Sequence, residues 1–210
     1  MYAEWNESMC SEKVFASKRN QVKLREDGLV EKRFADVDGA DRERSIYNAL
    51  APSDLCTPRF ISQSENVLWL SYEKAETFAE LLDAQEKEGK IDVRPWEALA
   101  DWLAGFYKHT GLIQKDVNLR NFLYDREKQT VIGLDFEDCG EGEPEEMAAS
   151  VMAFILLQDP SESKLKKDIV SYLKSCFAST MSCSLAELER FMDSETEKIK
   201  VRRERTNKKG

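Results

Sequence analysis

Three polar residues near the middle of this 210-residue chain have the types and the spacing that metal-assisted chemistry needs. Asp116 is followed five residues later by Asn121, and Asp135 comes directly after the apolar run from Val131 to Leu134. A carboxylate can orient and deprotonate a hydroxyl group, while an amide oxygen and a second carboxylate can hold Mg²⁺ on phosphate groups. Phosphoryl transfer to a hydroxyl needs these functions together, so it is the first chemistry that the pattern indicates.

Because this spacing alone arises by chance in many chains, the neighbouring elements must support it. We expect a helix from Arg94 to His109, with Pro95 in its first turn, Gly111 just past its end and apolar side chains recurring on one face. Two short strands should follow, over 122–124 and 131–134, joined by a polar turn. The alternative is a β-hairpin in which the Asp and Asn side chains only cap turns.

This order of helix, polar loop, short hairpin and acidic loop resembles the catalytic and metal-binding loops of the protein-kinase-like superfamily, most strongly over residues 112–137. The resemblance implies that Asp116 is the general base and that Asn121 and Asp135 are ligands of Mg²⁺. It further implies that ATP donates its γ-phosphate to a hydroxyl of a small molecule, a glycan or a protein, an acceptor that the sequence does not identify. The alternative is a pseudokinase or a nucleotide-binding partner subunit without turnover.

The N-terminal part of the chain is typical of a β-rich lobe. Short alternating segments over 13–16, 21–25 and 29–34 and a hairpin over 59–72 predict five strands. One helix is expected between the third and fourth strands, from about residue 40 to residue 50. Five strands and one helix match the small lobe that the resemblance implies.

Within that lobe the resemblance implies a lysine that positions ATP. Lys32 is the candidate for contact with the α- and β-phosphates, and Glu43 on the following helix would be its ion-pair partner. Tyr72 and Glu73, at the expected junction of the lobes, would offer backbone hydrogen bonds to adenine. The alternatives are that Lys32 faces solvent on an edge strand, with Arg33 in its place, and that Glu43 is a solvated carboxylate of a highly charged helix.

Several positions depart from the superfamily pattern. The segment from Ser17 to Asn20 contains no glycine, so the glycine-rich phosphate loop is absent. Gln114 replaces the histidine common two positions before the base, and Asn118 stands where protein kinases usually place a phosphate-contacting lysine. No long activation segment follows Asp135. These departures favour the compact branch, which resembles aminoglycoside phosphotransferases, lipopolysaccharide kinases, RIO kinases and the small tRNA-associated kinase.

The chain beyond residue 75 is predicted to be mainly helical. Thr77 with Glu80 and Ser184 with Glu187 have the form of capping boxes that begin helices, and the apolar run 151–157 predicts a buried one. The expected fold class is therefore α+β. It would be a bilobal protein-kinase-like fold with a small β-rich N-lobe (1–74) and a compact, mainly helical C-lobe that carries the catalytic hairpin (75–210).

Composition limits the compartments and partners to consider. No run approaches the ~20 apolar residues that cross a membrane, and the N-terminal residues lack the basic and apolar regions of a signal peptide. The five cysteines are odd in number, scattered and without a Cys-x-x-Cys pair. That pattern favours reduced thiols in the cytoplasm over disulfides or zinc. The residues are Cys10, Cys56, Cys139, Cys176 and Cys183.

The net charge of −9 opposes nucleic-acid binding through a basic face. The segment from Lys198 to Lys209 is nevertheless basic, and two interpretations remain open for it. It is either a solvated helix end whose cations match the helix dipole or a tail that contacts RNA. An acidic run over 137–146, beside the candidate site, is interpreted either as a solvated loop or as a surface that attracts a cationic acceptor.

Overall fold

The computed structural model describes residues 13–15, 17 and 19–207. The chain divides into two compact units: Met1–Asn48 with Pro58–Lys74, and Ala49–Thr57 with Ala75–Gly210. Cys10, the lysine at position 18 and the last two lysines of the basic tail, which entered the sequence predictions, lie outside the described residues.

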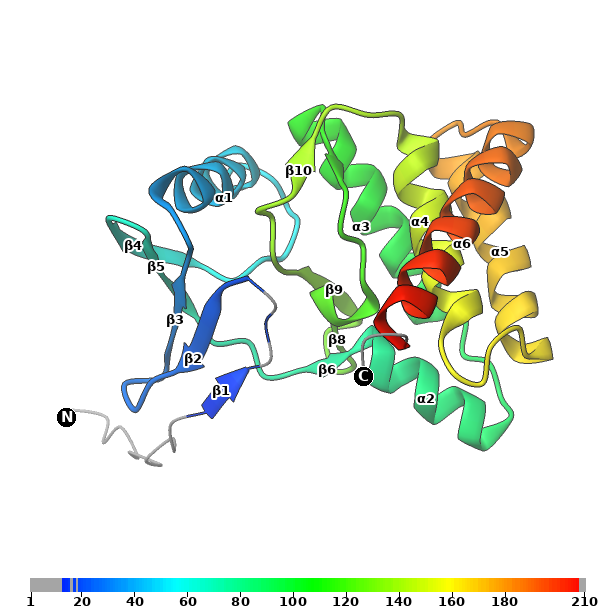
Figure 1. Ribbon diagram of the computed structural model, residues 1–210, viewed down its shortest axis with the longest axis horizontal. Helices are drawn as coiled ribbons and strands as arrows, with labels where there is room; N and C mark the ends of the chain where they lie inside the picture. The colour runs from blue at the N-terminus through cyan, green and yellow to red at the C-terminus, as the bar shows by residue number, and fades with distance from the viewer. Residues whose placement is uncertain (1–12, 16, 18, 208–210) are drawn as a thin grey trace. The chain divides into compact units, whose positions relative to one another are not determined.

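The described part of the first unit contains a five-stranded antiparallel sheet and the helix α1 (Val37–Leu50), as predicted (Figure 1). Its spatial order is β1-β2-β3-β5-β4, so β3 lies inside the sheet and pairs with strands on both sides. The strands are β1 (Lys13–Phe15), β2 (Gln21–Leu24), β3 (Leu29–Arg33), β4 (Phe60–Ser64) and β5 (Val67–Ser71).

The turn between β2 and β3 shows why the sequence folds locally as expected. Gly28 has a φ of 78°, a conformation that favours glycine, and its N–H donates to the carbonyl of Arg25 at 3.0 Å. The Asp27 carboxylate accepts from the N–H of Leu29 at 3.2 Å. Turn chemistry therefore sets the register in which β2 pairs with β3.

The second unit is mainly helical in its described residues. Its long helices are α2 (Phe78–Glu88), α3 (Arg94–Thr110), α4 (Pro144–Leu157), α5 (Lys164–Thr180) and α6 (Leu185–Asn207). Among the same residues, two small sheets carry the polar loops. One has the order β6-β8-β9 and the other pairs β7 with β10. The strands and the short 3₁₀ helix are β6 (Glu76–Thr77), β7 (Ile113–Gln114), η1 (Leu119–Asn121), β8 (Phe122–Asp125), β9 (Thr130–Gly133) and β10 (Cys139–Gly140).

Helix α4 carries the apolar run that predicted a buried helix, and most of its side chains are buried. In Figure 1, α6 lies against α4, a packing that the tertiary contacts support. Ile199 of α6, only 4% exposed, packs on Ala153 and Leu157 of α4. No helix in the described part of the chain combines the length and apolar character needed to cross a bilayer.

The two predicted capping boxes have different outcomes. Thr77 and Glu80 form the reciprocal box at the start of α2, as predicted. At the start of α6 only half of the box is present: Ser184 Oγ accepts from the N–H of Glu187 at 3.4 Å, but the N–H of Ser184 donates to Glu145 at 3.1 Å. The Glu187 carboxylate instead pairs with Arg190, one turn further along the helix, at 2.5 Å. The second prediction was wrong in this half because local and tertiary partners competed for the same groups.

Candidate active site

The loop that follows β7 is held by hydrogen bonds of its own asparagines. Asn121 Nδ2 donates to the backbone carbonyl of Asp116 at 2.9 Å, and the N–H of Asn121 donates to the carbonyl of Asn118 at 2.8 Å. Asn118 caps η1, since its side chain accepts from the N–H of Arg120 at 3.0 Å. Because the nitrogen of the Asn121 amide is bound to the loop, its oxygen is the atom that remains to face a cation.

A second set of bonds connects this loop to the end of β9. The N–H of Leu134 donates to the carbonyl of Asn121 at 2.8 Å. Gln114 Nε2 donates to the carbonyls of Leu134 and Asp135 at 2.9 and 3.1 Å. Gln114 is 1% exposed, so its amide is an internal brace of the loop. The three candidate residues, Asp116, Asn121 and Asp135, therefore belong to one connected set of backbone and amide hydrogen bonds.

Asp135 has a φ of 61°, in the left-handed region that few non-glycine residues occupy. A short polar side chain is among those that tolerate it, and such conformations persist where the surroundings over-determine them. Phe136, which is fully buried, supplies that constraint: its ring stacks on Trp102 at 6.2 Å and on Phe106 at 5.9 Å between ring centroids. The backbone of Asp135 is thus held by the bond from Gln114 to its carbonyl and by the packed ring of the next residue, Phe136.

Gly133 allows this close packing. A Cβ at this position would overlap the ring of Trp102, whose Nε1 donates to the carbonyl of Cys56 at 3.1 Å. The same carbonyl accepts from the N–H of Gly133 at 3.1 Å, and Cys56 forms a parallel bridge with Ile132. The segment after α1 thereby supports the end of β9, two residues before Asp135.

The first unit brings together the predicted lysine and glutamate. Lys32 Nζ lies 2.5 Å from Glu43 Oε2, and the two residues are 5% and 0% exposed. Lys32 also lies 4.8 Å from the centroid of the Phe34 ring. A buried ion pair is weak evidence for stability, because desolvation offsets much of its attraction, and such pairs also occur at functional sites.

The structure does not have the alternative arrangement, in which Lys32 faces solvent on an edge strand and Arg33 takes its place. β3 is an interior strand, so Lys32 does not face solvent on an edge, and Arg33 is exposed and pairs with Glu31 at 3.3 Å. Tyr72 and Glu73 follow directly after β5. The Tyr72 ring lies 6.3 Å from that of Phe15, and the Glu73 carboxylate accepts from Ser71 Oγ at 2.6 Å.

The donor chemistry of Asn121 and Asp135 fits Mg²⁺. One amide oxygen and one carboxylate are hard oxygen ligands, and Mg²⁺ is commonly held by one or two protein groups with phosphate oxygens and water completing its shell. Within residues 13–15, 17 and 19–207 there is no cluster of three or more His, Cys, Asp or Glu side chains suited to a metal. A fit therefore depends on phosphate oxygens as additional ligands.

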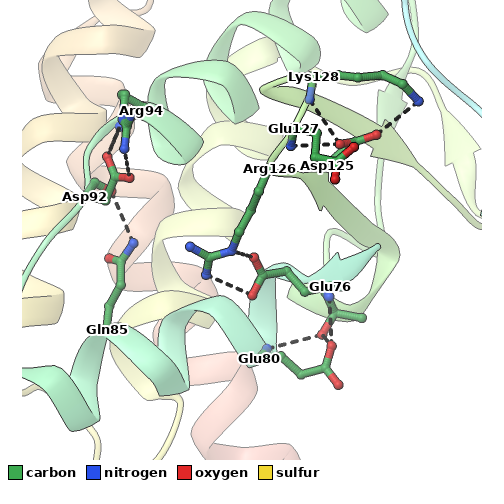
Figure 2. A network of polar contacts seen from close by, with 10 residues as sticks. Glu76, Glu80, Gln85, Asp92, Arg94, Asp125, Arg126, Glu127 and Lys128 are labelled. Carbon is green, nitrogen blue, oxygen red and sulfur yellow. Dashed lines mark hydrogen bonds and ion pairs between the residues drawn. The ribbon is translucent and has the colours of Figure 1, made fainter. Parts of the chain in front are cut away.

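A second polar cluster lies at the other end of the β8–β9 hairpin (Figure 2). Arg126, in the turn after β8, makes two hydrogen bonds with the carboxylate of Glu76. Asp92 accepts two bonds from the Arg94 guanidinium, at 2.9 and 2.6 Å. These side-chain hydrogen bonds lower the pKa of Asp92, and Glu76 raises the pKa of Arg126. Gln85 Nε2 donates to the carbonyl of Asp92 at 3.2 Å and so ties the cluster to α2.

Two hollows on the second unit were not predicted from the sequence. One of about 180 Å³ lies beside this cluster and includes Gln85, Asp92 and Arg126 in its lining. The other, of about 440 Å³, is lined by Lys115 and by one face of α6. Nothing in the local sequence could have revealed the second, because it joins residues about 80 positions apart in the chain.

One comparison with known proteins, the search of solved structures, supports the fold. No protein-family model and no curated protein sequence matches the chain. Among solved structures, the chain is similar to an ethanolamine kinase of Plasmodium vivax, with a TM-score of 0.58 and 8% identity, over 89% of this chain and 71% of that one. It also matches a kinase of Cydia pomonella granulovirus, with a TM-score of 0.45 and 15% identity, over 62% and 52% of the two chains. The first likeness confirms the predicted fold: an α+β, protein-kinase-like fold.

Proposed function

We propose that the protein is an ATP- and Mg²⁺-dependent phosphotransferase that moves the γ-phosphate of ATP to a hydroxyl group. The observation that carries the proposal is the connected hydrogen-bond set that fixes Asp116, Asn121 and Asp135 within a kinase-like fold. Phosphoryl transfer depends mainly on positioning and on electrostatic stabilisation, and a pre-organised set of oxygen ligands with a carboxylate base supplies both.

Each residue has a stated task in this mechanism. The Asp116 carboxylate orients the acceptor hydroxyl and receives its proton late in the reaction. The acceptor oxygen forms a bond to the γ-phosphorus as the bond to the β,γ-bridging oxygen breaks, and ADP leaves. Asn121 Oδ1 and the Asp135 carboxylate hold Mg²⁺, which when bound neutralises charge on the phosphates. Lys32, oriented by Glu43, contacts the α- and β-phosphates.

The side chains give less information about the contacts to adenine and to the acceptor than about the metal ligands and the base. Backbone groups of Tyr72 and Glu73 are proposed to bind adenine. Backbone hydrogen bonds of this kind do not depend on the identity of the side chains. The acceptor is a small molecule, a glycan or a protein, and the name of the Plasmodium neighbour makes ethanolamine one compound to screen. The proposed compartment is the cytoplasm, where the free thiols of Cys56 and Cys139 would stay reduced.

The test is ATP turnover with Mg²⁺ in the presence of a metabolite and peptide panel, for the parent and two variants. Asp116→Ala should slow transfer by ~10²–10⁴-fold while nucleotide binding is retained. Asp135→Ala should abolish Mg²⁺-dependent nucleotide binding. Asp125→Asn is the matched control, because it changes a half-buried aspartate at the far end of the β8–β9 hairpin, keeps an acceptor for the N–H groups of the turn and should leave both measurements unchanged. Turnover that is indifferent to Asp116 would contradict the mechanism.

Two observations favour a second candidate function, a nucleotide-binding subunit without turnover. Asn118 occupies a position where a lysine usually contacts phosphate, and here its side chain is used to cap η1. The loop from Ser17 to Asn20 also lacks glycine. Binding of Mg²⁺·ATP to the parent with no phosphorylation of any acceptor would select this function over the first.

A further inference from the structure

The hollow of about 180 Å³ beside the polar cluster of Figure 2 lies wholly within the second unit. Four lining residues share one face of α2, at positions i, i+3, i+4 and i+7: Leu81, Ala84, Gln85 and Glu88. The others come from the turn after α2, the first turn of α3 and the β8–β9 turn: Lys90, Asp92, Pro95 and Arg126. Pockets for drug-sized ligands measure roughly 300–1,000 Å³, so this one suits a smaller molecule.

The amide of Gln85 holds these segments together. Its side chain is 7% exposed; Nε2 donates to the carbonyl of Asp92 at 3.2 Å, and Oε1 accepts from Trp96 Nε1 at 3.1 Å. Both ends of the amide are thus bound to neighbouring segments, which fixes the shape of the hollow on this side. The apolar residues of the lining are Leu81, Ala84 and Pro95.

Two of the four charged lining residues already have partners of opposite charge. The Asp92 carboxylate accepts from the guanidinium of Arg94 at 2.9 and 2.6 Å. Arg126 binds the carboxylate of Glu76 through Nε and Nη2, so its Nη1 is left without an acceptor among the described residues. Both pairs are neutral as a whole, and Arg126 retains N–H groups that a ligand can use.

The other two charged lining residues, Glu88 and Lys90, have opposite signs and no ion pair within the part of the chain that the structure describes. They stand on either side of Gly89, whose left-handed conformation, with a φ of 63°, ends α2. The N–H of Lys90 donates to the carbonyl of Gln85 at 3.2 Å, so the backbone at this position is held. The hollow therefore offers one carboxylate and one ammonium group without an ionic partner.

The carboxylates act electrostatically on Arg126 across the hollow. The hydrogen bond with Glu76 is the main cause of the raised pKa of Arg126, and the charges of Asp92 and Glu88 raise it further. A molecule in the hollow therefore meets a carboxylate and cationic donors together.

We infer that this hollow binds a small zwitterion, a free α-amino acid with an aliphatic side chain. The ammonium group of the ligand pairs with Glu88, and its carboxylate accepts from Lys90 and Arg126, in charge-assisted hydrogen bonds. Its side chain contacts the apolar residues of the lining. A simple anion would be repelled by Glu88 and Asp92, and a simple cation by Lys90 and Arg126. None of these residues takes part in the proposed phosphoryl transfer, so the site is independent of it.

The test is ligand binding to the full chain, measured by calorimetric titration without nucleotide. Leucine and valine are the probes. The comparison ligands each lack one group of leucine: isocaproate lacks the ammonium group, isoamylamine lacks the carboxylate and glycine lacks the side chain. We expect leucine or valine to bind at least about tenfold more tightly than any of the three, because each of these loses one set of contacts.

Substitutions in the lining test the assignment of the contacts. Glu88→Gln and Lys90→Gln should each weaken the binding of leucine by roughly tenfold, because each removes a charged partner. Ala84→Leu keeps every charge but fills the apolar part of the hollow, so it should also weaken binding. Lys87→Gln is the matched control, since Lys87 lies in the last turn of α2 but outside the lining, and it should bind like the parent.

The outcomes are separate from those of the proposed function. Equal or tighter binding of isocaproate, isoamylamine or glycine overturns the inference, as does leucine binding that is unaffected by Glu88→Gln and Lys90→Gln. Failure of both leucine and valine to bind overturns it as well. Mg²⁺·ATP binding, measured on the same preparations, reports on the proposed function alone. Circular dichroism of each variant verifies that a loss of binding is not a loss of fold.

Discussion

The two ends of the β8–β9 hairpin are held by different kinds of interaction. At the end next to Phe122 and Gly133, amide groups of Gln114 and Asn121 bind backbone carbonyls, and aromatic rings pack beneath the loop. At the other end, charged side chains near the surface pair with one another, as in Arg126 with Glu76 (Figure 2). The same small hairpin is thus braced by buried neutral groups at the candidate site and by ion pairs at the far end.

The difference has a physical reason. Burying a neutral amide costs less free energy than burying a charge. Removing a buried amide leaves its carbonyl partners without a hydrogen bond, so the amide holds its partners strongly in one geometry. An exposed ion pair gains little in water and is screened by salt. Accurate placement of Asp116, Asn121 and Asp135 therefore depends on the neutral end, while the charged end contributes modestly to folding.

The largest effect is expected from Gly133→Ala. The added Cβ would overlap Trp102, which is held by Cys56 and stacked on Phe106, so the ring cannot move away at low cost. We expect a loss of about 3 kcal/mol in the free energy of unfolding, measured by urea denaturation.

Gly140→Ala is the matched control for that substitution. Its Cβ would meet only the mobile end of the Lys115 side chain, at 3.0 Å, so the change in stability should be below about 0.5 kcal/mol. Equal stability of the two alanine variants would show that the aromatic packing beneath the loop is not tight.

The next effect concerns Gln114. Gln114→Ala removes both amide donors and leaves the carbonyls of Leu134 and Asp135 buried without them, at a cost of about 2 kcal/mol in stability. We also expect weaker Mg²⁺-dependent nucleotide binding, because the left-handed conformation of Asp135 loses its support. Binding can be followed by fluorescence titration with a labelled nucleotide.

Gln114→His distinguishes positioning from general packing. An imidazole N–H can donate to one of the two carbonyls, so this variant should recover part of the Mg²⁺-dependent affinity that Gln114→Ala loses. If the alanine variant binds Mg²⁺ and nucleotide as the parent does, the amide does not position Asp135.

The site could be predicted in part because its residues lie close together in the sequence. Asp116 and Asn121 occupy one loop, and Asp135 follows a short apolar strand that its composition already indicates. The Thr77 capping box and the Gly28 turn were predictable for the same reason. Each depends on side chains that act on their own backbone.

What could not be predicted depends on contacts between distant segments. Gln114 was noticed only as a departure from a histidine, and its role comes from bonds to residues twenty positions away. The N–H of Ser184 is bound by Glu145, thirty-nine positions away, which no local pattern contains. The two-residue strands β7 and β10 were not predicted, because two residues are too few to show an alternating hydrophobic pattern.

At the far end of the hairpin the effects should be smaller. Arg126→Gln removes an ion pair in which the arginine side chain is 63% exposed, so stability should fall by less than about 1 kcal/mol. Turnover should not change, because the candidate site is held independently. A loss of stability comparable to that of Gln114→Ala would remove the contrast between the two ends.

The smallest effect is a dependence on pH that comes from Asp92. The bonds from Arg94 lower its pKa in the folded protein below the ordinary value of 3.8, so the unfolded chain binds this proton at a higher pH. The stabilisation is therefore fully present above about pH 5 and disappears as the pH falls through the folded pKa. Asp92→Asn keeps an acceptor for Arg94 but removes the charge. The difference in unfolding free energy between parent and variant should be constant from pH 7 to pH 5 and should shrink below pH 4. A difference that grows on acidification would mean that the pair opposes folding, and the far end would then not be stabilised by its charges at all.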